Sequence, residues 1–262
     1  MANPIDYRAP TPYETVRRAW SWGRQHVSFI LLLCALVIAG GIWAFVKIAD
    51  EVLEGDTQHF DEWAIRSLRR ANDLATPIGP GWLHEVGRDA TALGGMFVLT
   101  MVTLAVGGYL LIVRKYRAML LVLGTTFGGL ILSTILKNSF NRQRPSIVPH
   151  LSNVYTSSFP SGHSMLSAIV YLTLGVMLSR LVPNRAAKIY FLLVAMGLTL
   201  LVGVSRVYMG VHYPTDVLAG WTAGCVWATI CYLIARALQK RGKVERDVDE
   251  PGGVEAKVES AH

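Results

Sequence analysis

Charged residues are scarce in this chain of 262 residues. Asp, Glu, Lys and Arg make up 16% of it, whereas they form about a quarter of a typical soluble domain. Cysteine is also rare, and Cys34, Cys225 and Cys231 all fall within apolar stretches, so the sequence indicates neither a disulfide framework nor a zinc motif. The chain instead has 52% hydrophobic residues, gathered in long runs. This composition excludes disordered, collagen-like and coiled-coil proteins and predicts a membrane protein with one bundled domain.

Six stretches contain no Asp, Glu, Lys or Arg and are apolar enough to cross a membrane. They are residues 27–46, 90–113, 118–136, 164–179, 189–204 and 217–235. The fourth and fifth are short for a membrane span, so we expect their helices to extend into the flanking polar residues. The first is too long for the apolar part of a signal peptide and is expected to be an uncleaved anchor. We therefore predict an all-α fold, a polytopic membrane bundle of six transmembrane helices.

The segments between these stretches divide into two sets, one for each face of the membrane. The set that includes both tails carries 16 Lys and Arg and 8 Asp and Glu, whereas the other set carries 9 and 10. Because positively charged segments stay on the cytoplasmic side, we predict that both termini are cytoplasmic. Loops 47–89, 137–163 and 205–216 would then face out of the cytoplasm. This distribution accounts for the net charge of +7 without nucleic acid binding.

The chain divides into a cytoplasmic amino tail of residues 1–26, a membrane domain of residues 27–238 and a flexible cytoplasmic tail of residues 239–262. Residues 11–14 form a capping box with proline at the first helical position, which predicts a short helix in the amino tail. The 47–89 loop is predicted to contain an amphipathic helix that lies either on the outer leaflet or, as a lid, on the bundle. Its apolar positions are Phe60, Trp63, Ala64 and Leu68.

Residue types that bind or transfer phosphate recur in two of the outer loops. They are Lys137, Arg142, Arg144, Ser161, Gly162 and His163 in the first loop, and Arg206, His212 and Asp216 in the second. A basic side chain at the bilayer centre costs about 2.5–3.5 kcal/mol, so these residues must lie at the membrane interface or in a wet cavity. Arg142 either contacts phosphate or faces lipid head groups.

Ser161 and Gly162 stand directly before an apolar run. Serine is a favoured N-cap, glycine permits close approach of the backbone, and the amino end of a helix binds anions. Lys137, Arg144 and Arg206 would supply the charge that neutralises a phosphate group. Any one of these basic residues would be explained more simply by snorkelling to the interface, but three of them beside a glycine-containing helix start indicate an anion site.

His212 and Asp216 are four residues apart around Pro214, which is expected to start the sixth helix. A carboxylate bonded to one ring nitrogen fixes the imidazole tautomer and leaves the other nitrogen free to attack, so His212 is a candidate nucleophile. His163 would protonate the departing oxygen as a general acid. One alternative is a structural histidine–aspartate hydrogen bond that caps a helix. Another is a metal site, but a divalent cation would sit badly beside three basic residues, and we expect neither a metal nor a cofactor.

Three motifs occur in order along the chain: Lys137-x6-Arg144-Pro145, Pro160-Ser161-Gly162-His163 and Ser205-Arg206-x5-His212-x3-Asp216. Together they resemble the signature of the type-2 phosphatidic acid phosphatase superfamily, and the resemblance covers residues from about 90 to 235. It implies a six-helix membrane enzyme that removes phosphate from lipid phosphates or diphosphates through a phosphohistidine and without a metal. The phosphate would be bound by Lys137, Arg144, Arg206, Ser161 and Gly162. His212 would attack, Asp216 would orient it and His163 would protonate the leaving group.

The superfamily also includes vanadium haloperoxidases, which resemble soluble helical proteins and are disfavoured by six apolar spans. We expect a lipid phosphatase at the outer face of a bacterial-type cytoplasmic membrane. Undecaprenyl diphosphate is the first candidate substrate, because the loops are short and no domain is added. Phosphatidylglycerol phosphate, phosphatidic acid and lipid A phosphates are alternative substrates, and a lipid phosphotransferase is an alternative activity. A non-enzymatic lipid-phosphate transporter is the alternative from another class. The expected partners are the lipid substrate and the membrane lipids.

Overall fold

The computed structural model describes residues 29–150 and 156–240, which form eight helices and one short hairpin. The elements are α2 (Phe29–Glu54), α3 (Gln58–Ser67), β1 (Arg69–Arg70), β2 (Asp73–Pro77), α4 (Gly81–Leu93), α5 (Met96–Ile112), α6 (Tyr116–Ser139), α7 (Gly162–Leu181), α8 (Arg185–Tyr208) and α9 (Pro214–Lys240). The two strands pair antiparallel within the 47–89 loop. The fold is therefore all-α apart from this hairpin. The capping box of residues 11–14 and the chain beyond residue 240 lie outside the described residues.

Five of the described helices, α2, α6, α7, α8 and α9, are long and apolar enough to cross a membrane. A sixth span results if α4 and α5, which are bent by 50° at the break between them, are taken as one. The predicted span over residues 90–113 is not one continuous helix, because the chain breaks at Gly94 and Gly95 and α5 starts at Met96. The expected extension of the fourth and fifth spans is confirmed, since α7 begins at Gly162 and α8 at Arg185.

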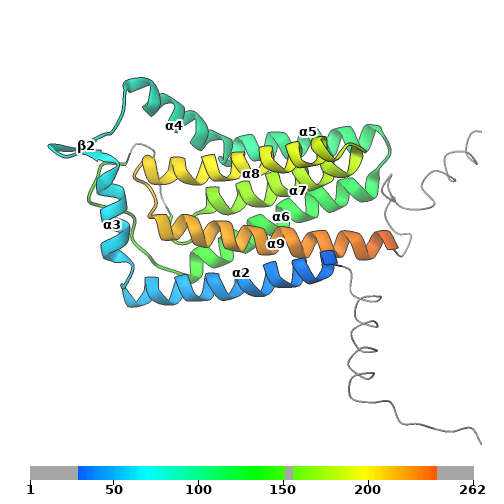
Figure 1. Cartoon of the computed structure of the whole chain (residues 1–262), viewed down its shortest axis with the longest axis horizontal. Coiled ribbons are helices and arrows are strands. Elements are labelled where there is room, and N and C mark those ends of the chain that lie inside the picture. Colours follow the sequence, from blue (N-terminus) through cyan, green and yellow to red (C-terminus); the bar gives the residue numbers. More distant parts are fainter. Residues whose placement is uncertain (1–28, 151–155, 241–262) are drawn as a thin grey trace, which may run out of the picture.

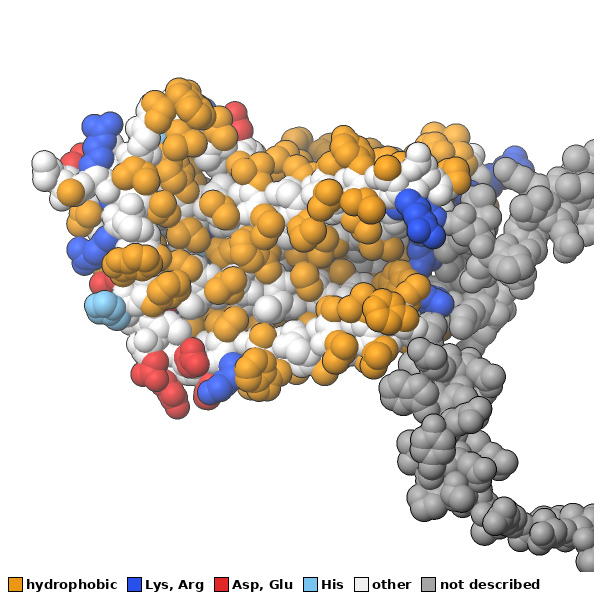
Figure 2. Space-filling model, viewed as in Figure 1, with side chains coloured by type: hydrophobic (Ala, Val, Ile, Leu, Met, Phe, Trp, Pro, Cys, Tyr) orange, Lys and Arg blue, Asp and Glu red, His pale blue; other side chains and the backbone are white. Residues whose placement is uncertain are grey.

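The spanning helices are arranged around α7, which packs against α5, α6, α8 and α9, while α2 lies along α9 (Figure 1). Met165 and Ile169 on α7 are completely buried in the main apolar core. Large apolar side chains cover the outer surface of the bundle, and charged side chains gather near its two ends (Figure 2). This is the opposite of a soluble protein and fits a helix bundle surrounded by lipid tails. The chain is an integral, multi-pass membrane protein.

Two glycines of α9 allow its backbone to lie directly against α7. A Cβ atom added at Gly220 would lie 2.6 Å from the carbonyl oxygen of Ser161, and one at Gly224 would lie 2.7 Å from that of Met165. No side chain fits at either position without moving a backbone. This close contact fixes the start of α7 relative to the start of α9.

One end of the bundle brings together the last turns of α6 and α8, the first turns of α7 and α9, and helix α3 (Figure 1). Helix α3 has two faces: Asp61 and Ile65 are completely buried, whereas Phe60 and Trp63 are about half exposed and stack on each other. A helix is present in the predicted place, but it packs on the bundle through Asp61 and Ile65, whereas Phe60 and Trp63 of the predicted apolar face stay exposed and Leu68 lies just beyond the helix. The described chain begins in α2 and leaves α9 at the opposite end of the bundle (Figure 1).

Candidate active site

The residues singled out in the sequence come together at the end of the bundle that carries α3. Lys137 comes from the last turn of α6, Arg206 from the last turn of α8, and Arg144 from the loop after α6. Ser161, Gly162 and His163 start α7, His212 lies in the turn before α9, and Asp216 lies in the first turn of α9. Three segments far apart in the sequence thus form one cluster.

The amino end of α7 is tied to the start of α9. The hydroxyl of Ser161 caps α7 by accepting from the backbone N–H of Ser164, and the N–H of Ser161 donates to the carbonyl oxygen of Asp216 at 2.9 Å. The amine of Lys137 lies on the other side, since its Cε atom is 3.0 Å from the position of a Cβ atom on Gly162. A helix start lined by a lysine and by backbone N–H groups that lack helical partners is suited to an anion.

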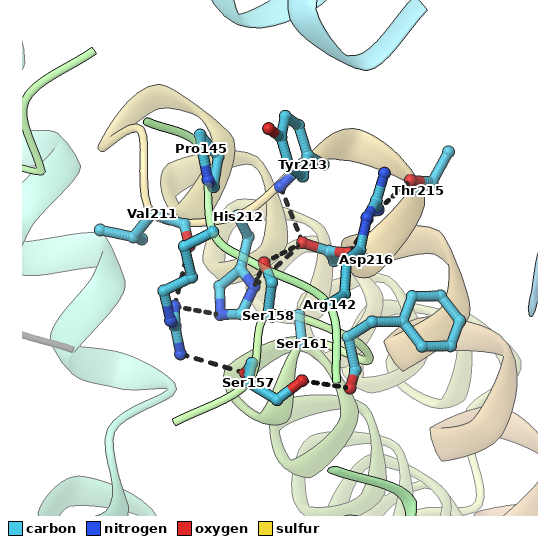
Figure 3. Close-up of polar contacts among 12 residues, drawn as sticks. Arg142, Pro145, Ser157, Ser158, Ser161, Val211, His212, Tyr213, Thr215 and Asp216 are labelled. Carbon is cyan, nitrogen blue, oxygen red and sulfur yellow. Dashed lines mark hydrogen bonds and ion pairs between the residues drawn. The ribbon is translucent and has the colours of Figure 1, made fainter. Parts of the chain in front are cut away.

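His212 is almost completely buried, and both of its ring nitrogens have neighbours (Figure 3). Nδ1 lies 3.4 Å from Asp216 Oδ2, and Nε2 lies 3.2 Å from Nη1 of Arg144. Because the guanidinium only donates, Nε2 carries the lone pair and Nδ1 carries the proton. Burial lowers the pKa of His212 to about 3, although Asp216 acts to raise it, so the imidazole is neutral near pH 7. The ring therefore presents a free lone pair toward the basic residues.

The two oxygens of the Asp216 carboxylate have different partners. Oδ2, which faces His212, also accepts from the hydroxyl of Ser158 and from the backbone N–H of Tyr213, the latter at 2.9 Å (Figure 3). Oδ1 accepts from Nη1 of Arg142 at 2.6 Å. A completely buried carboxylate with this many donors is held in one orientation.

The basic residues of the cluster are bonded to neutral carbonyl groups. Lys137 donates to the carbonyl of Ser157 at 3.0 Å, and Arg144 donates at 2.8 Å to each of the carbonyls of Thr156 and Val211. Arg206 is 2% exposed, and its Nε is one of the buried side-chain atoms that lack a hydrogen-bond partner among the described residues. Among the described residues none of these three side chains forms an ion pair with an acid, so positive charge is concentrated here and a bound oxyanion would supply a partner.

His163 is half-buried at the start of α7 and interacts electrostatically with Arg206, His212, Lys137 and Arg144. It also adjoins the break between α4 and α5, because a Cβ atom on Gly94 would lie 3.3 Å from the Cβ of His163. The two histidines therefore belong to one cluster but come from different elements.

Several residues of this region were not identified from the sequence. Ser158 touches both His212 and Asp216, and it stands only three residues before Ser161, which is the one signal that pointed to it. Arg142 contacts two buried carboxylates, Asp61 and Asp216, so neither of its expected roles, phosphate contact or lipid contact, is what the structure gives. Asp61 comes from α3, and nothing in its sequence context connects it to the motifs. The described residues contain no group of three His, Cys, Asp or Glu side chains placed to hold a metal ion.

Fold and site define a multi-pass membrane protein in which a neutral, buried histidine adjoins a cluster of basic side chains. Residues 117–240 match the model of the PAP2 superfamily. The chain is 37% identical over 167 residues to phosphatidylglycerophosphatase B of Bacillus subtilis. This match covers 62% of this chain and 80% of that protein. It is 32% identical over 107 residues to a lipid A 1-phosphatase of Rhizobium etli, which covers 37% of this chain and 41% of that protein.

Among solved structures, the fold is similar to a crystal structure described as the first transmembrane PAP2 type phosphatidylglycerolphosphate phosphatase from Bacillus subtilis. The TM-score is 0.69 at 27% sequence identity, and the match covers 80% of this chain and 100% of that one. The chain belongs to the PAP2 superfamily, and it is a membrane hydrolase of lipid phosphates. The resemblance seen in the three motifs is confirmed.

Proposed function

We propose that this membrane phosphatase removes the terminal phosphate from glycerophospholipid phosphates, with phosphatidylglycerol phosphate as the preferred substrate. The observation that carries the proposal is the 37% identity to phosphatidylglycerophosphatase B over 80% of its length. The crystal structure of a phosphatidylglycerolphosphate phosphatase from Bacillus subtilis is also matched over its whole chain. Short loops were the argument for undecaprenyl diphosphate, and they are weaker support than this similarity. Because the chain is a lipid phosphate hydrolase, a non-enzymatic transporter is not needed to explain the basic residues.

The phosphate group is bound where the positive charge is unbalanced. Lys137, Arg144 and Arg206 neutralise its oxygens, and the N–H groups at the start of α7, capped by Ser161 and including Gly162, contribute further donors. Phosphoryl transfer spreads negative charge over the equatorial oxygens in the transition state, and donors that are already in place stabilise that charge without reorganising water.

His212 attacks through Nε2, which forms a nitrogen–phosphorus bond while the bond from phosphorus to the glycerol oxygen breaks. The N–H of Arg144 that now points at Nε2 turns to a phosphate oxygen, which frees the lone pair. Asp216 keeps the proton on Nδ1 and so holds the reactive tautomer. The bound phosphate supplies negative charge that favours the protonated form of His163, which gives its proton to the departing oxygen and then takes one from the water that hydrolyses the phosphohistidine.

The active site faces out of the cytoplasm, and both termini lie inside. Three observations support this orientation. The excess of Lys and Arg lies in the segments on the side of the termini. The beginning of α2 and the end of α9 are at the end of the bundle opposite the site (Figure 1). The exposed aromatic pair of α3, Phe60 and Trp63, is placed at the site end, where amphipathic rings suit a lipid interface.

A substrate panel in detergent tests the proposed function. Purified protein is given phosphatidylglycerol phosphate, phosphatidic acid, a lipid A phosphate and undecaprenyl diphosphate, and inorganic phosphate is measured, with His212→Ala as the blank. We expect the highest kcat/KM with phosphatidylglycerol phosphate and no release by the variant. A higher kcat/KM for undecaprenyl diphosphate would overturn the substrate, and parent-like release by His212→Ala would overturn the nucleophile. Formation of a new lipid phosphate in place of inorganic phosphate would indicate a phosphotransferase.

A further inference from the structure

Arg142 lies just outside the signature motifs and bridges two buried carboxylates. Its Nη1 is 2.6 Å from Oδ1 of Asp216, and its Nη2 is 2.7 Å from Oδ2 of Asp61. The guanidinium carbon lies 4.4 Å from the centre of the Tyr213 ring, which covers one of its faces. Only 11% of the Arg142 side chain is exposed. An arginine with this many fixed contacts has no freedom to reach a phosphate group.

Asp61 holds the other end of this bridge and comes from helix α3. It is completely buried and accepts from the N–H of Thr215 at 3.1 Å and from the Thr215 hydroxyl at 2.6 Å. Thr215 is in the first turn of α9, so Asp61 provides a carboxylate to the amino end of the helix that carries Asp216. The outer-loop helix is therefore bonded both to Arg142 and to the turn that holds the catalytic aspartate.

The bridge determines which oxygen of Asp216 faces His212. With Oδ1 taken by Arg142, Oδ2 is left for the imidazole and its neighbours. The bridge also sets a positive charge directly beside the buried Asp216 carboxylate, which compensates part of its negative charge. Burial alone would lower the pKa of Arg142, but Asp216 and Asp61 raise it above its ordinary value, so the arginine is charged near neutral pH.

We propose that Arg142, held in place by Asp61, is a positioning residue for the phosphoryl-transfer step and acts on His212 through Asp216. This inference depends on the proposed role of His212 as nucleophile. Neither residue touches the substrate. Their effect is to keep Asp216 ionised and correctly turned toward His212.

A double-mutant cycle on kcat separates this role from phosphate binding. Arg142→Gln is expected to lower kcat about 10- to 100-fold, the range reported for outer partners of metal-bound histidines, with KM unchanged. Arg142→Lys should recover part of the loss. In an Asp216→Asn background, Arg142→Gln should cost little more, because the group through which it acts is already lost. Equal losses in both backgrounds, or a rise in KM without a fall in kcat, would overturn the proposal.

The part played by α3 is tested with a matched pair of substitutions. Asp61→Asn removes the buried carboxylate, and Glu62→Gln removes the neighbouring one, which pairs with Arg66 on the exposed side of the same helix. Asp61→Asn should lower kcat and be non-additive with Arg142→Gln, whereas Glu62→Gln should match the parent. If the two variants had equal activity and equal thermal midpoints, Asp61 would have no part in positioning Arg142.

A measurement without substrate keeps this inference distinct from the proposed function. The ¹⁵N NMR spectrum of histidine-labelled protein in detergent reports the tautomer and the protonation of His212. The titratable or charged groups that act on this ring are Asp216 of α9, Arg144 of the loop, Arg206 of α8 and His163 of α7. Arg142→Gln should weaken the Nδ1–H tautomer, because the Asp216 carboxylate is no longer held in its orientation, and it should make His212 titrate at a higher pH, because the negative charge of Asp216 is no longer balanced. If the tautomer and the titration of His212 were unchanged in Arg142→Gln, the inference would be overturned even if the lipid panel identified the proposed substrate. If the panel instead identified another substrate, the NMR result would still hold.

Discussion

A single methyl group added to α9 at Gly220 should disable the enzyme without altering any polar group. The Cβ atom of Gly220→Ala would lie 2.6 Å from the carbonyl oxygen of Ser161, which is 0.8 Å less than the 3.4 Å at which ordinary van der Waals contact begins. The carbonyl belongs to the backbone at the start of α7, so α7 and α9 must move apart. Ser161 and His163 move with one helix and Asp216 with the other. A displacement of about 1 Å at reacting groups costs about 100-fold in rate.

The assay is kcat on a short-chain phosphatidylglycerol phosphate, with the thermal midpoint of each variant measured in the same detergent. The matched control is Gly197→Ala in α8, where an added Cβ meets nothing within 4 Å. Since alanine favours a helix over glycine by about 0.8–1.0 kcal/mol, the control should be as active as the parent and slightly more stable. If Gly220→Ala were as active as Gly197→Ala, the close packing of α7 on α9 would not be what aligns the site.

Three further outcomes follow from the site. The pKa of His212 is about 3 in the folded protein, below its ordinary value of 6.5, so the unfolded chain takes up protons first as the pH falls. The thermal midpoint should therefore decrease as the pH is lowered from about 6.5 to about 3, and this decrease should be smaller in His212→Asn. Arg206→Met removes a buried cation that we propose donates to phosphate, so the inhibition constant of inorganic phosphate should rise about 10- to 100-fold, with an unchanged constant as the contrary result. Phosphate release should survive EDTA and be inhibited by vanadate, which resembles the five-coordinate phosphorus, whereas loss of activity restored by Mg²⁺ would contradict the metal-free mechanism.

The spans and the motif residues were predictable because each leaves a local trace in the sequence. A helix that crosses lipid needs about 20 consecutive residues that are predominantly apolar, so the charge-free stretches indicate the spans directly. The three motifs each occupy a few consecutive positions at the end of a span. Helix ends on one membrane face then bring Lys137, His163 and His212 to the same end of the bundle. The extension of α7 to Gly162 followed from the shortness of its apolar run.

The partners of these residues were not predictable, since they depend on which loop packs on which helix. Asp61 meets Arg142 across 81 positions of sequence, and its neighbours in α3 are charged or aromatic residues with no common spacing to the motifs. The break between α4 and α5 was missed because Gly94 and Gly95 lie inside a charge-free stretch, where glycine alone does not end a helix. The lipid preference is not contained in loop length at all, and similarity to related enzymes carries more information about it.

The central position of α7 has a consequence for how the protein is made. Among the described helices long enough to span, α7 has the lowest mean hydropathy and by far the largest buried share. Its serines, its two glycines and His163 are acceptable because neighbouring helices, not lipid, surround much of the helix. Transfer of a newly synthesised α7 alone from the insertion machinery into lipid would be less favourable than for the other spans. Its stable integration should therefore wait until α8 and α9 have been synthesised and can pack around it. The helix that carries part of the proposed catalytic centre is thus expected to be the last one to integrate stably into the membrane during biogenesis.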